Sequence, residues 1–237
     1  ANATYDSATG TLTPTDSLID GAYELTYTLT DAAGNESDPS APFSLTIDTA
    51  AAAPILTLAE DTGASGSDGI TKNGQFNVTG IESGASWQYT TDGGSNWISP
   101  ANGATSFTLA ERTYADQTIQ VRQTDAAGNT SALTIYNQEL TVDTTPLTAT
   151  LSDSVSGTTN APVLFTISFS EAVSHFSLDQ LTVLGGTAGS LTKVDDKTYT
   201  LVVTPNTNSA DPISVTLAAG SVADLAGNAL ATSTTHT

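Results

Sequence analysis

Hydrophobic and polar residues alternate with a period of two along most of this chain. Neighbouring side chains of a β-strand point to opposite faces, so each alternating run is typical of a strand with one buried face. Turn residues separate these short runs, and no long run has the spacing of a helix, which predicts antiparallel β-sandwiches. The clearest runs place apolar side chains at Tyr23, Leu25, Tyr27 and Leu29; Phe43, Leu45 and Ile47; Phe76 and Val78; Ile119 and Val121; Val163, Phe165, Ile167 and Phe169; Tyr199, Leu201 and Val203; and Ile213, Val215 and Leu217.

The pentapeptide Asp-Xaa-Ala-Gly-Asn occurs three times, at Asp31–Asn35, Asp125–Asn129 and Asp224–Asn228. The three copies start 94 and 99 residues apart. Recurrence at a nearly fixed period is the mark of a tandem array with one structural unit per repeat. The chain of 237 residues is therefore expected to form two or three small domains instead of one large domain.

A second repeated phrase marks the domain boundaries. Leu45–Thr49 and Leu140–Thr145 both end a β-patterned run with Asp-Thr, and Pro54 and Pro146 follow them. Proline cannot continue a strand ladder, so each phrase predicts the end of a last strand and the start of a linker. Module one supplies about half the strands of its neighbours, so we expect the C-terminal half of a truncated repeat. The predicted modules are residues 1–49 (module one), 50–144 (module two) and 145–237 (module three).

The charge of the chain limits its partners. Five basic and 25 acidic residues give a net charge of −20, so the surface repels nucleic acids and anionic lipids, and we expect neither nucleic-acid binding nor membrane insertion. The sequence has no cysteine, which excludes disulfides and thiolate metal sites, so a bound metal would be a hard cation held by oxygen. No signal peptide or membrane span is recognisable, as expected of an internal fragment. The composition fits a secreted or surface protein of bacteria.

Four motifs together resemble a known family: Asp20–Tyr23 (Asp-Gly-Ala-Tyr), the Asp-Xaa-Ala-Gly-Asn turn, the Ile/Val-Asp-Thr strand end, and Trp87–Trp97. With them the chain resembles the bacterial immunoglobulin-like (Ig-like) repeats of giant type 1-secreted, calcium-binding adhesins, which include SiiE- and BapA-like proteins and large RTX adhesins. Module three resembles a different subfamily of the same class, through Phe169–Val173. The resemblance implies an all-β chain of tandem Ig-like antiparallel β-sandwiches arranged end to end as a rod.

The same resemblance implies a function and a location. Such repeats form the structural stalk of a bacterial cell-surface adhesin, which Ca²⁺ at the module junctions stiffens so that it projects a distal binding region. The partners implied are the neighbouring Ig-like repeats of the same chain, with a host-cell surface or glycan bound through other regions. We expect a secreted, extracellular and monomeric protein.

An Ig-like strand order also brings acidic residues together at each junction. The turn before the last strand lies at the end facing the preceding module, whereas the last strand and the loop before the penultimate strand end at the opposite side. Ca²⁺ takes six to eight oxygen ligands and would relieve the repulsion between crowded carboxylates.

At the junction of modules one and two (joint one) the predicted ligands are Asp20, Asp48, Asp125 and Asn129. At the junction of modules two and three (joint two) they are Asp116, Asp143, Asp224 and Asn228, with Asp61 and Asp68 as additional candidates. Asp31 and Asn35 would face a module preceding module one.

Two simpler interpretations of these acidic turns stay open. Asp and Asn favour tight turns because their side chains bond nearby backbone amides, and Gly supplies a positive φ. The repeated pentapeptide could thus be turn chemistry alone, or calcium could bind inside the modules.

Residues suited to catalysis are scarce. His175 and His236 show no zinc-binding spacing and are expected on the surface. Residues 90–97 fit the Asp-box pattern of sialidase propellers, but a propeller needs several blades, so one copy predicts a hairpin. Trp87 and Tyr89 share one strand face and are expected in the core. We therefore expect no enzyme.

Two other functions remain as alternatives. The chain could be a glycan- or host-ligand-binding module of the adhesin, gripping its ligand by an exposed edge or aromatic face. It could also be an accessory Ig-like domain of a secreted polysaccharide-active enzyme.

Overall fold

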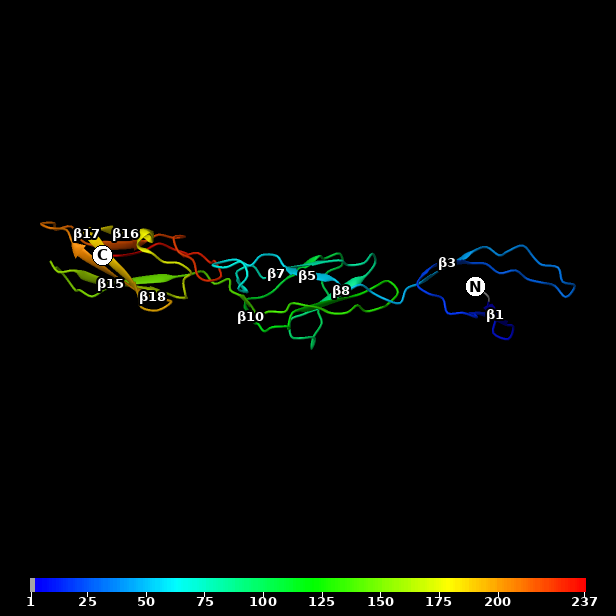
Figure 1. Cartoon of the computed structure of the whole chain (residues 1–237). Helices are drawn as coiled ribbons and strands as arrows, with labels where there is room; N and C mark the ends of the chain where they lie inside the picture. Colours follow the sequence, from blue (N-terminus) through cyan, green and yellow to red (C-terminus); the bar gives the residue numbers. More distant parts are fainter. Residues whose placement is uncertain (1–2) are drawn as a thin grey trace.

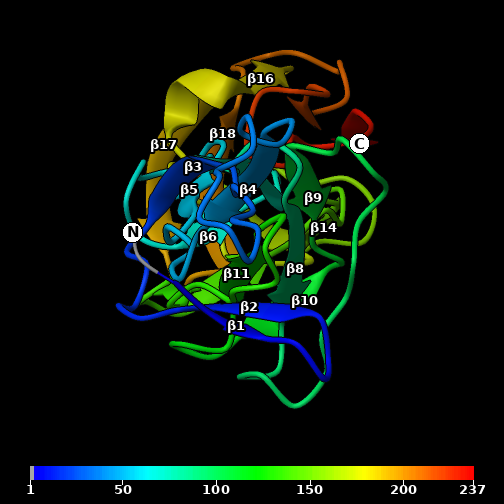
Figure 2. The same ribbon diagram turned by 90° about the vertical axis from the view of Figure 1, so that its right-hand side faces the viewer.

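The computed structural model describes residues 3–237 and shows an all-β chain drawn out into a line (Figure 1). Module two lies between module one, near the N-terminus, and module three, near the C-terminus. Seen from the end, the modules project onto one another (Figure 2). The helical part of the described chain is one 3₁₀ turn, η1 (Leu178–Gln180). The predicted all-β fold of antiparallel sandwiches is confirmed.

Module two is a closed sandwich built from three small sheets, in the orders β5-β7-β9, β12-β11-β8 and β10-β13-β6. The pairs are antiparallel except β13 with β6, which run parallel. The strands are β5 (Ile55–Leu58), β6 (Ile70–Thr71), β7 (Gln75–Thr79), β8 (Ser86–Thr90), β9 (Ser106–Thr108), β10 (Arg112–Tyr114), β11 (Gln120–Thr124), β12 (Thr134–Ile135) and β13 (Leu140–Val142).

The core of module two follows the alternation of the sequence. Phe76 and Val78 lie on β7, Val121 lies on β11 of another sheet, and Ile119 directly precedes β11; all four are almost fully buried. Trp87 is also buried and donates from Nε1 to the carbonyl of Ala104 at 2.8 Å. Its indole is therefore part of the core.

Module three has its own core between two sheets, in the orders β14-β15-β18-β17 and β16-β19-β20. Phe165 and Ile167 of β15 face Val215 and Leu217 of β19, and the four side chains are at most 1% exposed. The strands are β14 (Ala149–Asp153), β15 (Val163–Phe169), β16 (Leu181–Leu184), β17 (Gly186–Lys193), β18 (Thr198–Pro205), β19 (Ser214–Leu217) and β20 (Thr234–His236).

Module one consists of two separate hairpins in its described residues. They are β1 (Ala3–Asp6) with β2 (Thr11–Pro14), and β3 (Gly21–Leu25) with β4 (Phe43–Ile47). No second sheet covers β3 and β4 within residues 3–49, so Tyr27, Leu29 and Phe43 are more than half exposed. The alternating pattern is present here without the core that it normally packs against.

One detail marks where the penultimate strand of modules one and two starts. The Tyr114 hydroxyl donates to the carbonyl of Ala110 at 2.9 Å, and the Tyr23 hydroxyl donates to that of Ile19 at 2.7 Å. This is the tyrosine corner of Ig-like sandwiches, which marks the start of the penultimate strand. In module two that strand therefore begins at Arg112. Within residues 3–237 no helix has the length and hydrophobicity needed to cross a membrane.

Candidate cation site between modules

The three repeated turns share one hydrogen-bond pattern. In each turn the Asp amide donates to the Asn carbonyl, the Gly amide donates to the Asp carbonyl, and the Asn amide donates to a carboxylate oxygen of the Asp. Gly34, Gly128 and Gly227 have φ between 89° and 97°, a left-handed conformation that glycine adopts without strain. These hydrogen bonds and the positive φ of Gly are enough to explain why Asp, Gly and Asn recur, which agrees with the interpretation of the pentapeptide as a tight turn.

Each internal turn also touches the Asp-Thr phrase that ends the module before it. Asn129 Nδ2 donates to the Asp48 carbonyl at 2.9 Å across joint one. Asn228 Nδ2 donates to the Asp143 carbonyl at 2.9 Å across joint two. The first turn, Asp31–Asn35, lies at the tip of module one that points away from module two (Figure 1).

The Asp224 carboxylate differs from its two counterparts. In the first two turns the Asn side-chain amide donates to the second Asp oxygen, at 2.9 Å for Asn35 and 2.8 Å for Asn129. In the third turn the Asn228 amide is bound to the Asp143 carbonyl, and Asp224 Oδ2 has no hydrogen-bond partner among residues 3–237. Asp224 is only 2% exposed. A buried, unpaired carboxylate oxygen is costly and requires a compensating positive charge or proton.

Asp224 meets two other carboxylates at joint two. One oxygen each of Asp143, Glu171 and Asp224 lies within 4.8 Å of the other two. Asp143 follows β13 of module two, whereas Glu171 follows β15 and Asp224 lies in the turn before the last strand of module three. The cluster therefore spans the junction. Oxygens that share one Ca²⁺ at 2.3–2.6 Å can lie at most about 5 Å apart, so this spacing fits a single calcium ion.

The electrostatics of Glu171 reflect this crowding. Burial, the hydrogen bond with Asp143, and the negative charges of Asp143 and Asp224 raise the pKa of Glu171 to about 7. Lys197 opposes the shift and donates from Nζ to the Ser170 carbonyl at 2.9 Å. Glu171 lies outside the predicted ligand set, because its approach to Asp143 depends on how two modules dock.

Joint one does not bring three carboxylates together in the described residues. Asp125 is buried, but both of its oxygens are bonded to Asn129, and these bonds lower its pKa with the Asn129 side chain as the largest cause. Glu82 follows β7 as Glu171 follows β15, and its carboxylate accepts the Ala52 amide at 2.8 Å. Glu82 is thus the counterpart of Glu171 and is engaged by the linker.

The remaining predicted ligands lie at the end of module one, in the loop 61–72, and, for Asp116, within the penultimate strand of module two. Asp20 accepts the Thr49 hydroxyl at 2.9 Å, and Asp48 accepts the Ala50 amide at 3.3 Å, so both lie at the end of module one that faces joint one. In the loop 61–72 of module two, Asp61 Oδ2 accepts the Gly69 amide and Oδ1 is buried without a partner in the described chain, whereas Asp68 is exposed.

Asp116 lies away from the end of module two that carries Asp143. The penultimate strand already begins at Arg112, and Asp116 falls in the interruption between β10 and β11, beside Gln117 with a φ of 63°. Glu111 stands where Asp20 stands in module one, since it accepts hydrogen bonds from the hydroxyls of Thr144 and Thr145.

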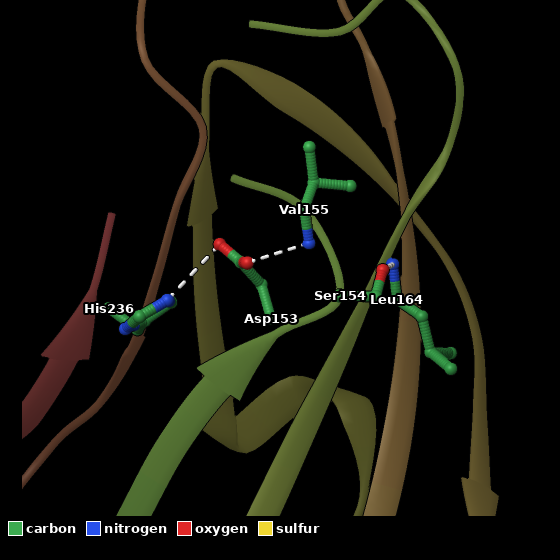
Figure 3. Close-up of polar contacts among 5 residues, drawn as sticks. All are labelled: Asp153, Ser154, Val155, Leu164 and His236. Carbon is green, nitrogen blue, oxygen red and sulfur yellow. Dashed lines mark hydrogen bonds and ion pairs between the residues drawn. The ribbon is translucent and has the colours of Figure 1, made fainter. Parts of the chain in front are cut away.

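The histidines lie away from this cluster. His175 is exposed. His236, on β20, is partly buried and lies 3.1 Å from Asp153 Oδ2, while Asp153 Oδ1 accepts the Val155 amide and Ser154 accepts the Leu164 amide (Figure 3). The contact between His236 and Asp153 joins the last strand to β14.

Comparison with known proteins identifies the modules. A family model described as a bacterial Ig-like domain matches residues 2–49 and 50–144, and a second model with the same description matches residues 143–237. The chain belongs to the bacterial Ig-like domain family. No curated protein matches these Ig-like domains. A solved structure, described as "Crystal structure of tetra-tandem repeat in extending region of large adhesion protein", is 17% identical with a TM-score of 0.29. The match covers 92% of this chain and 57% of that one, so the Ig-like domains here span little more than half of its length.

Proposed function

We propose that this chain is an extender segment of a bacterial cell-surface adhesin, in which Ca²⁺ at the module junctions holds the Ig-like domains in line. The family and the end-to-end arrangement of modules support a mechanical role (Figure 1). The main support for a calcium site is the cluster of Asp143, Glu171 and Asp224, together with the buried, unpaired oxygen of Asp224.

The donor set fits calcium. All three side chains offer oxygen, and two carboxylates 4 Å apart repel by ~4 kcal/mol at an effective dielectric constant of 20. Asp143 comes from one module and Glu171 and Asp224 from the next, so an ion held by all three would resist bending. When bound, the ion supplies positive charge that reverses this repulsion.

Calorimetric titration of the chain with CaCl₂ tests the site. We expect binding in the range of about 10⁻⁴ to 10⁻³ M that is typical of extracellular modules. Asp224→Asn should remove one site, because it keeps the oxygen that accepts the Asn228 amide but removes the charge.

A matched control is Asp92→Asn. Asp92 bonds the amide and side chain of Asn96 just as the turn residues do, but it lies in the hairpin after β8. This variant should bind as many calcium ions as the unmodified chain. Equal stoichiometry for Asp224→Asn and the unmodified chain would refute the site.

A further inference from the structure

A second set of contacts at joint two needs no ion. Residues 61–72 of module two, here called the clasp loop, comprise the loop before β6, β6 itself and Lys72. They run beside the turn of module three, and the two line one groove. Three consecutive carbonyl oxygens of that turn each accept a hydrogen bond from the clasp loop. The Ala64 amide donates to Leu225 at 3.3 Å, the Thr62 hydroxyl to Ala226 at 2.6 Å, and the Lys72 ammonium to Gly227 at 2.9 Å.

Two glycines allow this approach. A Cβ on Gly63 would lie 2.0 Å from the Leu225 carbonyl oxygen, and a Cβ on Gly227 would lie 3.1 Å from the Gly63 backbone. The two backbones are thus in direct contact across the joint. The Thr62 hydroxyl is held in place because it also accepts the Lys72 amide at 2.8 Å.

Joint one lacks such a clasp in the described chain. Within residues 3–237, no hydrogen bond from module one reaches the carbonyls of residues 126–128, the counterparts of residues 225–227. The direct polar contact there is the bond from Asn129 to Asp48.

We propose that the clasp loop is a docking socket for the backbone of the next module's Gly-containing turn, and that it keeps joint two aligned when no cation is bound. The socket forms hydrogen bonds with main-chain carbonyl groups of the turn and not with its side chains. It therefore fits any Ig-like module with a turn of this shape. This inference rests on the proposed function in one respect, because both assign to the junction the role of keeping the modules in line. Joint one, which lacks the clasp, would then be the more flexible joint, and calcium would reinforce joint two.

Single-molecule energy transfer in the full chain tests this division. The sequence has no cysteine, so dyes can be placed at Glu36→Cys with Asn102→Cys across joint one, and at Asn102→Cys with Val194→Cys across joint two. In excess chelator we expect a narrow transfer-efficiency peak for joint two and a broad distribution for joint one.

Two variants, each with a control, isolate the clasp in chelator. Gly63→Ala should broaden the joint-two peak, whereas Gly103→Ala, which has a similar positive φ but open space around it, should not. Lys72→Met should broaden the joint-two peak less than Gly63→Ala does, because it leaves the backbone of the loop unchanged. Its control for the lost charge is Lys193→Met, since Lys193 lies in module three beside Asp196.

The outcomes separate the two proposals. A joint-two peak that broadens in chelator as much as that of joint one, or that neither Gly63→Ala nor Lys72→Met alters, overturns the clasp and leaves the calcium site standing. A chain that binds no calcium but keeps a narrow joint-two peak would refute the calcium site and support the clasp.

Discussion

Glu171 is the residue whose charge state should govern calcium binding at joint two. Its pKa is raised to about 7, first by burial and then by Asp143. Without an ion, a carboxyl group with a raised pKa favours the docked state at low pH and loses that contribution as the pH rises from about 4.5 through 7. Calcium reverses the dependence, because its ligands must be deprotonated.

We therefore expect calcium affinity at this site to rise with pH, by up to about tenfold per pH unit below pH 7, and to level off above it. Glu171→Gln should bind calcium more weakly and with little pH dependence between pH 5 and about 8. Titrations at several pH values measure both. A pH profile that Glu171→Gln leaves unchanged would show that another group controls binding.

At the scale of the strand, alternation is enough to predict the cores of modules two and three but not the edges of the elements, and in module one it predicts a core that is absent from the described residues. The run from Val163 to Phe169 forms β15, and its four alternating apolar side chains are buried. Asp116 was expected at the far end of module two because the alternating run starts at Ile119. The strand instead begins at Arg112 and is interrupted at Gln117, whose left-handed backbone breaks the period.

The two closed modules should unfold separately, since their cores share no buried residue. Leu140 and Leu201 are fully buried in modules two and three. Leu140→Ala should destabilise module two, and Leu201→Ala module three, each by about 2–5 kcal/mol. Differential scanning calorimetry should show one transition moving in each variant. Both transitions moving together would mean that the modules fold as one unit.

At the scale of the whole molecule, the proposed function depends on the contacts between modules, where sequence patterns are least informative. The repeated pentapeptide predicts that Asn129 and Asn228 lie at the junctions as calcium ligands. Each donates a hydrogen bond to the preceding module, and their binding of calcium stays a prediction. The pentapeptide could not reveal Glu171, Thr62 or Lys72, because their roles depend on the docking of surfaces far apart in the sequence.

The most direct test of the calcium site is a crystal structure of the chain grown in millimolar calcium, with anomalous scattering to identify the ion. We expect one calcium ion at joint two, bound by oxygens of Asp143, Glu171 and Asp224 from both modules. Docked modules whose three carboxylates have moved apart, with no ion between them, would contradict it.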